Sequence, residues 1–180
     1  MQEEQEFIQE LLNPKTQNEA FQKLLHTYQR PLYHHIRNIV LNHDDTDDVL
    51  QNTFIKIFQN LKNFKGESKL FSWMYRIATN ESLTFIKQKA RKLKVSTEEL
   101  NTKSIDNLVS DVYFEGDEIQ LKLQKAIALL PTKQQLGFKM KYFEELKYEE
   151  IAAILNTSVG ALKASYHHAV KKIEAYVTSN

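Results

Sequence analysis

The sequence has no cysteine, only 4 glycines and 3 prolines in 180 residues, and no long apolar run. The absence of cysteine excludes a disulfide framework, thiolate metal sites and a thiol nucleophile. Sheets joined by tight turns usually contain more glycine and proline, so the composition favours helices. The short apolar runs predict no membrane-spanning helix, and the acidic start MQEEQEF lacks the basic and apolar parts of a signal peptide. We therefore expect a helical protein that stays in the cytoplasm, without membrane insertion.

The net charge of +1 conceals an uneven distribution of charge along the chain. Residues 1–92 contain 13 basic and 11 acidic residues, residues 93–120 contain 2 and 7, and residues 121–180 contain 9 and 5. An acidic segment therefore lies between two blocks that are near neutral or basic. The total charge alone disfavours a nucleic-acid partner, whereas the segment charges do not.

Apolar residues recur at helical spacing through most of the chain, which predicts an all-α fold. Pro31 falls inside one apolar stripe and should kink that helix or start a second one. The polar, acidic stretch 95–116 has no sustained period, and we interpret it as a flexible linker. The sequence thus predicts two small helical domains, 1–94 and 117–180, joined by an acidic linker.

Local signals predict where three of the helices begin. One helix should start at Asp44 or Asp45, and Ser68 should cap the next helix after a loop. Thr132 and Gln135 fit a capping box, in which both side chains satisfy backbone groups at the helix start.

Residues 148–168 fit a helix-turn-helix with its turn at Asn156. Asparagine tolerates the left-handed backbone that this turn needs, and Thr157 or Ser158 can cap the second helix. One face of that helix carries basic and small residues and no acid, so it could lie against DNA. The alternative is a plain helical hairpin with a solvated basic face.

Three sets of residues, taken together and in order, carry a family resemblance over nearly the whole chain. The C-terminal set resembles region 4 of bacterial sigma factors, and the N-terminal sets resemble the core-binding and promoter-melting parts of region 2. The short acidic linker between them is similar to that of the extracytoplasmic-function (ECF) subfamily, which keeps only these two domains. The sets are Leu130, Pro131, Tyr148 to Ala152, Ser158 to Gly160 and Lys163; Asp45, Asp48, Gln51, Thr53 and Phe54; and Phe64, Trp73, Arg76, Ile77, Ala78 and Asn80.

The resemblance implies an alternative sigma factor, which is a non-catalytic subunit that binds core RNA polymerase, recognises the −35 and −10 promoter elements and promotes strand opening. It implies no cofactor and no metal. The implied partners are the clamp coiled coil of the largest polymerase subunit, the flap region, promoter DNA and an anti-sigma factor, which could hold the protein at the membrane. The implied contacts are Asp45, Asp48, Gln51 and Phe54 for core polymerase; Phe64, Lys65, Ser72, Trp73, Arg76, Asn80 and Lys87 for the −10 element; and Ser158, Lys163, Ala164, Ser165, His167, His168 and Lys171 for the −35 element.

The chemistry of these residues agrees with the implied roles. Asp45, Asp48 and Gln51 share much of one helix face, and such a strip suits a basic partner. An acidic first turn that serves only the helix dipole is the alternative. Trp73 can stack on an unpaired base and Asn80 can read a base edge, although Trp73 could equally be a core residue.

The helix after Asn156 has a basic ridge. Lys163, His167 and Lys171 recur every four residues, away from the apolar side that Leu162, Tyr166 and Ile173 should form. Lys163 is nearest the helix start, where recognition helices usually reach bases, whereas Lys171 is better placed for phosphates.

The chain departs from the sigma-factor pattern at several positions. Thr84 and Lys87 stand where an acid and an arginine are usual, and Ser165 and His168 occupy commonly basic positions. Gly137 lies inside a predicted helix, at a cost of about 1 kcal/mol in helix propensity. These changes leave the fold assignment intact and put the −35 sequence preference in doubt.

Three other classes of protein are weighed against a sigma factor. An enzyme is disfavoured because the pairs His34-His35 and His167-His168 point about 100° apart on a helix and have no acid at metal-ligand spacing. A helix-turn-helix regulator that binds duplex DNA without polymerase agrees with the C-terminal block but not with the N-terminal one. A purely structural helical protein explains neither the aromatic and basic residues near Trp73 nor the segregated charge.

Overall fold

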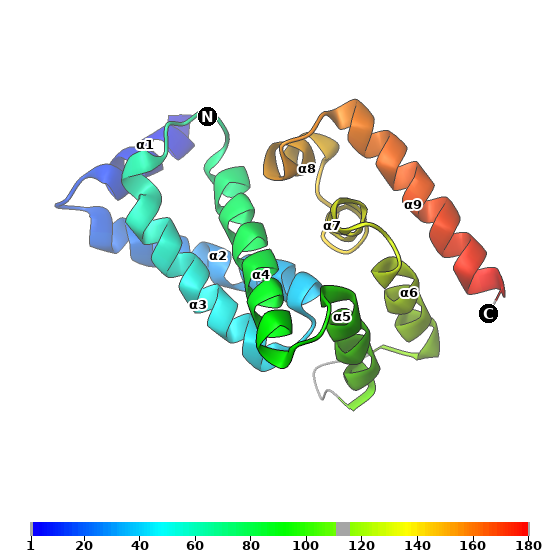
Figure 1. Ribbon diagram of the computed structural model, residues 1–180. Coiled ribbons are helices and arrows are strands. Elements are labelled where there is room, and N and C mark those ends of the chain that lie inside the picture. Colours follow the sequence, from blue (N-terminus) through cyan, green and yellow to red (C-terminus); the bar gives the residue numbers. More distant parts are fainter. Residues whose placement is uncertain (1, 111–115, 180) are drawn as a thin grey trace.

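The computed structural model describes residues 2–110 and 116–179. Over these residues all regular structure is helical, which confirms the predicted all-α fold (Figure 1). Among the described helices, none combines the length and apolar character needed to span a bilayer. The elements are α1 (Gln2–Leu12), α2 (Gln17–Val40), α3 (His43–Asn60), η1 (Leu61–Asn63), α4 (Leu70–Leu93), α5 (Thr97–Asp106), η2 (Asn107–Ser110), α6 (Glu118–Ala128), α7 (Thr132–Tyr142), α8 (Tyr148–Leu155) and α9 (Val159–Ser179).

Helices α1–α4 form the N-terminal part, whose core lies between α2, α3 and α4. Leu24, Ile36, Ile57 and Met74 are fully buried there, at the helical spacing that the sequence shows. Helix α2 runs through Pro31 without a break, so the alternative in which a second helix starts at that residue is wrong. Pro31 is exposed, and the carbonyl group that loses its partner in the turn before it can therefore face water.

Two helix starts in the N-terminal part differ from the prediction. Asn42 is the N-cap of α3, and its side chain accepts a hydrogen bond from the backbone N–H of Asp45 (2.9 Å). Helix α4 has no side-chain cap from Ser68. The backbone N–H of Leu70 instead donates to the carboxylate of Glu4 in α1 (2.9 Å). Glu4, which is far away in sequence, thus satisfies a backbone N–H group at the start of α4, where local signals predict a cap by Ser68.

The capping box predicted at Thr132 and Gln135 is wrong. Helix α7 begins after Pro131 without a side-chain cap. The amide of Gln135 instead donates to the carbonyl oxygens of Ala128 (3.2 Å) and Leu130 (2.7 Å). It therefore satisfies carbonyl groups that the end of α6 leaves without partners.

The predicted linker 95–116 contains helix α5 and the short turn η2, so its lack of regular structure is corrected for residues 97–110. Ser96 caps α5 by accepting a hydrogen bond from the backbone N–H of Glu99 (3.0 Å). Leu100 and Ile105 are buried. A ten-residue helix with two buried residues is too short to show a period in the sequence. The rest of the linker prediction, residues 111–115, falls outside the described residues.

Helices α8 and α9 form the predicted helix-turn-helix. Asn156 has φ 50° and ψ 58°, the left-handed backbone expected at this turn. Ser158 caps α9 by accepting a hydrogen bond from the backbone N–H of Ala161 (3.1 Å). Leu162 and Ile173 are buried on the inner side of α9, as predicted.

Gly137 lies where α7 passes close to the helix-turn-helix. A Cβ atom at this position would be 3.3 Å from Cδ2 of Leu162 and 3.9 Å from Cδ1 of Leu155. The close approach of three helices accounts for a glycine where helix propensity disfavours one.

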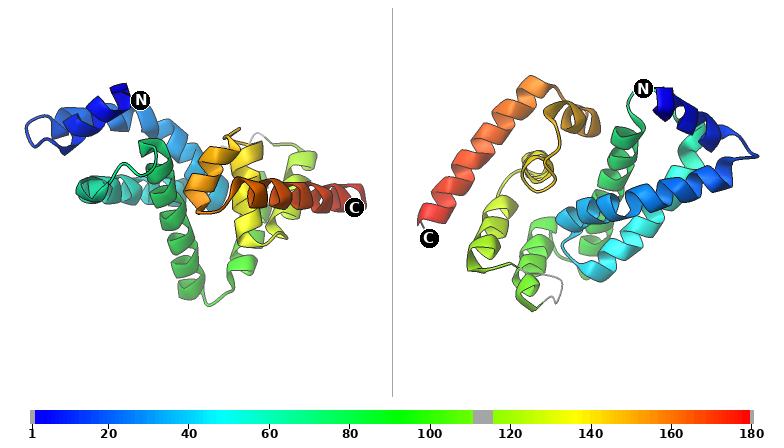
Figure 2. Two further views of the ribbon diagram at one scale, coloured as in Figure 1. Left: turned by 90° about the horizontal axis from the view of Figure 1, so that it is seen from above. Right: turned by 180° about the vertical axis from the view of Figure 1, so that it is seen from behind.

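The N-terminal part and the C-terminal part, α6–α9, lie against each other (Figures 1 and 2). Helix α8 packs on α4, and α7 contacts α2. One apolar cluster therefore runs from the N-terminal core into the C-terminal part, whereas a smaller cluster lies between α6, α7 and α9. The C-terminal members of the shared cluster are Leu136, Met140, Ile151, Ile154 and Leu162.

Candidate functional site

The acidic strip predicted for core polymerase lies on α3, where two of its residues are free to meet a partner. The side chains of Asp48 and Gln51 are exposed. Asp45 forms an ion pair with Lys89 of α4, so part of its charge is neutralised within the chain. Phe54 is only 8% exposed and packs edge-on against Phe21 (ring centroids 6.5 Å apart). Phe54 therefore lies in the core beneath this surface rather than on it.

An apolar hollow of about 560 Å³ opens beside the strip, between α2 and α3. Its lining includes Phe21, Leu25 and Phe54, and it reaches Ile55 and Phe58, which are 53% and 41% exposed. Exposed apolar groups in one patch indicate a binding surface. No feature of the sequence assigns a binding role to Ile55 or Phe58. Ile55 is an apolar residue outside the core-facing stripe of its helix. This position in the sequence could have indicated an exposed apolar surface.

The aromatic group predicted to contact the −10 element lies at the start of α4. The rings of Phe64 and Trp73 pack together, with centroids 5.1 Å apart. Phe64 is buried and Trp73 half-buried. A hollow of about 270 Å³ between α3 and α4 is lined by Trp73, Ile77 and the exposed Asn80. The Trp73 indole and the Asn80 side chain therefore line the same surface hollow, which has room for a planar group.

The other predicted −10 residues have different surroundings. Lys65 and Lys87 are exposed. Ser72 is 2% exposed, so its side chain is covered in this structure and its predicted DNA contact is not available on the surface. Arg76 faces the C-terminal part, where its Nη2 donates to the carbonyl oxygen of Ala153 in α8 (2.5 Å).

The predicted −35 surface is the outer face of α9. Lys163, Ala164, His167, His168 and Lys171 are all exposed there. The remaining two predicted residues have structural roles as well: Ser158 caps the helix, and the carbonyl oxygen of Ser165 accepts a hydrogen bond from Gln134 (3.1 Å). The Lys163 ammonium lies 5.7 Å from the Tyr148 ring, so the ring holds this cation near the helix start.

A buried polar cluster joins the two parts of the chain. His35 of α2 is fully buried, and its Nδ1 lies 2.9 Å from the carboxylate of Glu144, which follows α7. Lys139 of α7 donates to the carbonyl oxygen of Asn38 (2.8 Å). Burial lowers the pKa of Lys139 to about 8, and the nearby Glu144 carboxylate offsets part of that effect. Burial, followed by Glu144, raises the pKa of the neighbouring Tyr75 phenol.

The lowered pKa of Lys139 predicts how stability depends on pH. Between pH 8 and 10 the unfolded chain keeps a proton that folded Lys139 releases, so the free energy of unfolding should rise with pH. The contribution is about 2 kcal/mol over this range. Urea unfolding of the wild type and Lys139→Met at several pH values measures it. Stability differences that do not change with pH would contradict the burial of this ammonium.

The comparisons with known proteins identify the two parts of the chain. Residues 24–92 match the family of sigma-70 region 2, and residues 120–173 match sigma-70 region 4. The chain is 29% identical over 161 residues to the ECF RNA polymerase sigma factor SigW of Bacillus subtilis, covering 85% of this chain and 86% of SigW. This chain is an ECF sigma factor. A further relative is the ECF sigma-E factor of Escherichia coli K12, 26% identical over 178 residues, with 89% and 87% covered.

Two solved structures share the fold of this ECF sigma factor. CnrH in complex with the cytosolic domain of CnrY superposes with a TM-score of 0.65 at 19% identity, covering 91% of this chain and 90% of CnrH. The sigma factor RpoE of Bartonella quintana, in complex with the anti-sigma factor NepR, superposes with a TM-score of 0.63 at 18% identity, covering 88% and 96%.

All the predicted site residues of the sigma factor fall inside the two matched segments. Helices α1 and α5 lie outside them, although α1 supplies the Glu4 contact to α4. Within the described residues, no group of three or more His, Asp or Glu side chains could hold a metal ion.

Proposed function

We propose that this sigma factor acts as a non-catalytic initiation subunit in the cytoplasm, directing core RNA polymerase to a specific set of promoters. The observation that carries the proposal is the presence of both sigma regions, in order, in one chain. The surface on α3 supports it, because exposed Gln51 lines the hollow that reaches Ile55 and Phe58, and exposed Asp48 lies about one helical turn before Gln51. Charged groups around an apolar centre are typical of a protein interface.

The polymerase partner proposed for this surface is the clamp coiled coil of the largest subunit, and the flap region is the partner proposed for the C-terminal part.

The −10 strand is assigned to the hollow of Trp73 and Asn80, where a flipped base can stack on the indole. The −35 element is assigned to the outer face of α9.

The solved structures of CnrH and RpoE contain CnrY and an anti-sigma factor, respectively. They support the proposal that an anti-sigma factor binds this chain and holds it inactive. If that factor is anchored in the membrane, it would hold the chain there.

Gel filtration of the chain with core polymerase, alongside a gel shift with duplex DNA alone, tests the proposal. A sigma factor should elute with core polymerase and bind free duplex poorly. A helix-turn-helix regulator should bind duplex by itself and elute separately from polymerase, and this result would overturn the proposal.

Two lysines of α9 should have different effects on promoter recognition. Lys163→Ala should cost about 1–3 kcal/mol and relax the preference within the −35 element, because this residue lies nearest the helix start. Lys171→Ala should weaken binding evenly across sequences and lower the salt slope by about 1, as expected for a phosphate contact. Transcription from a panel of −35 variants measures both. If Lys171→Ala is the substitution that shifts the preference, the placement of α9 in the groove is wrong.

A further inference from the structure

Residues 65–69 form a loop that leads into α4 beside the hollow proposed for the −10 strand. Phe64 and Leu70, which flank this loop, are buried, whereas residues 65–67 are exposed. Gly66 has φ 72°, a left-handed backbone that glycine adopts without strain. The two ends of the loop are therefore held in the core, and its middle is accessible.

Helix α1 reaches both ends of this loop. It contacts η1, which precedes the loop, and the Glu4 carboxylate accepts a hydrogen bond from the backbone N–H of Leu70 (2.9 Å). Helix α1 is itself packed on α2, and its residue Leu11 is buried in the core. The loop is thus connected to the core of the N-terminal part through α1.

Glu4 supplies a carboxylate that the start of α4 lacks. The first turn of α4 has no acidic residue, and its N-cap is Lys69, whose side chain has no acceptor. The first N–H groups of a helix have no partner within it and carry a partial positive charge. Burial, followed by the Glu4 carboxylate, raises the pKa of Tyr28 in α2. The carboxylate is therefore within reach of both α2 and the positive end of α4.

The first turn of α4 also determines where the indole of the −10 hollow lies. The backbone N–H of Trp73 donates to the carbonyl oxygen of Lys69 (3.1 Å), which closes this turn. The Trp73 ring packs on Phe64, at the other end of the loop. If the turn frays, the two rings and the loop gain conformational freedom. A base that binds there must then order these groups, which weakens its binding.

We propose that Glu4 is a positioning residue for the −10 contact, because it fixes the first turn of α4 and, through that turn, the loop of residues 65–69 and the Trp73 indole. The proposal rests on the function proposed above. Glu4 does not touch DNA and acts only by pre-organising the groups that do. Helix α1 lies outside the segment that matches sigma-70 region 2, so this contact is not part of the matched pattern.

Three substitutions separate the hydrogen bond from other effects of the charge. Glu4→Ala removes the acceptor and introduces a residue that favours helix. Glu4→Gln keeps an oxygen acceptor without the charge. Glu3→Ala removes a carboxylate from the exposed neighbour in α1 and is the matched control.

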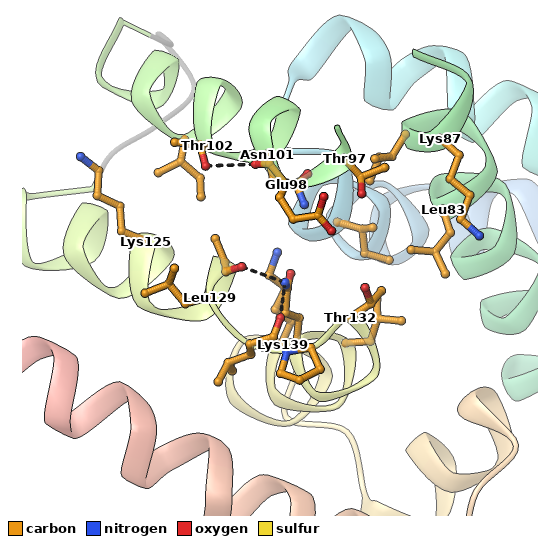
Figure 3. Close-up of a pocket in the computed structure, with 18 of the residues that line it drawn as sticks. Leu83, Lys87, Thr97, Glu98, Asn101, Thr102, Lys125, Leu129, Thr132 and Lys139 are labelled. Carbon is orange, nitrogen blue, oxygen red and sulfur yellow. Dashed lines mark hydrogen bonds between the residues drawn. The ribbon is translucent and has the colours of Figure 1, made fainter. Parts of the chain in front are cut away.

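A second control lies in another part of the chain. A cavity of about 680 Å³ borders the second half of α4, and its lining includes Leu83 and Lys87 of α4 and Glu98 of α5 (Figure 3). Glu98 is exposed, so Glu98→Ala removes one carboxylate away from the first turn of α4. It should leave that turn and the −10 preference unchanged.

The free chain tests the contact without polymerase. Amide hydrogen exchange reports whether the Leu70 N–H is protected, and acrylamide quenching reports the surroundings of Trp73, the one tryptophan in the sequence. Glu4→Ala should speed exchange at Leu70 by at least about tenfold and should make Trp73 easier to quench. In Glu4→Gln the exchange should stay within about threefold of the wild type, and both controls should match the wild type.

The complex with core polymerase tests the positioning role. The probe is a fork-shaped DNA whose non-template strand is single-stranded over a randomised −10 segment, and sequencing of the bound strands gives the base preference. Glu4→Ala should reduce this preference by at least about threefold while the affinity for core polymerase stays within about twofold of the wild type. Glu4→Gln should keep the wild-type preference. A smaller amount of folded protein would lower the quantity of DNA bound and leave the preference unchanged.

Unchanged exchange at Leu70 and unchanged quenching of Trp73 in Glu4→Ala would overturn the contact. Faster exchange with an unchanged −10 preference would overturn the positioning role, and a Glu4→Gln variant that fails as Glu4→Ala does would overturn the hydrogen bond as its cause. A wild-type chain that does not bind polymerase, or that binds the fork without base preference, contradicts the proposed function instead, because the free-chain measurement needs neither polymerase nor DNA.

Discussion

Replacing Asp48 with lysine is expected to lower the affinity for core RNA polymerase by about 30-fold, which corresponds to about 2 kcal/mol. Asp48 is exposed on α3, about one helical turn before Gln51, which lines the hollow that reaches Ile55 and Phe58. The substitution replaces an attraction for a basic partner with a repulsion, next to apolar groups whose burial strengthens it. Fluorescence anisotropy with a labelled chain measures the change in affinity.

Glu6→Lys on α1 is the matched control, because it makes the same charge reversal at an exposed residue outside the region 2 segment. It should leave the affinity within about twofold of the wild type, as for a distant screened charge. Circular dichroism shows whether both variants keep their helix content. A folded Asp48→Lys variant with undiminished affinity would remove α3 from the proposed interface.

Asn80→Ala and Trp73→Ala should impair strand opening much more than they impair formation of the closed promoter complex. Stacking on an aromatic ring contributes about 1–3 kcal/mol per base, so loss of Trp73 should reduce the open fraction by at least about tenfold. Asn80→Ala is the cleaner substitution because Asn80 is exposed, whereas Trp73 also supports Phe64. Permanganate reactivity of unpaired thymines on a cognate promoter measures opening.

Asn18→Ala provides the control for this pair, since Asn18 is an exposed asparagine on α2 that precedes the region 2 segment and does not line the hollow. It should melt promoters as the wild type does. Wild-type melting by Asn80→Ala would contradict the base contact proposed for α4.

Some features of the fold that depend on neighbouring residues were predicted correctly from the sequence, although the three predicted helix starts were not. The turn at Asn156 and the cap at Ser158 are local, because each depends on one residue's backbone preference or side-chain reach. The buried side of α9 follows from its period.

Features that depend on contacts between distant segments could not be predicted. The Glu4 contact to α4, the use of Gln135 at the end of α6 and the pairing of His35 with Glu144 each need the assembled fold. For the same reason the resemblance assigned Arg76 to the −10 element, whereas in this structure its Nη2 donates to the carbonyl oxygen of Ala153 in α8. Helix α5 was missed because its two buried residues give no period.

For the candidate site, the exposure of each residue depends on the tertiary fold. Asp48, Gln51 and Asn80 are exposed, as contact with a partner requires, whereas Ser72 lies in the core. A small residue between core positions gives no signal of which way it faces. The apolar patch on α3 was not assigned, because an exposed apolar residue is common on any surface.

Transcription reconstituted from purified core polymerase and this chain tests the central claim most directly. The templates are a library with randomised −35 and −10 segments, and sequencing of the transcripts reports which promoters are used. Core polymerase with the chain should start transcripts at defined positions downstream of a common −10 and −35 sequence, and core polymerase alone should not. Transcription that the chain leaves unchanged, together with binding of the chain to duplex DNA in the absence of polymerase, would contradict its assignment as an initiation subunit.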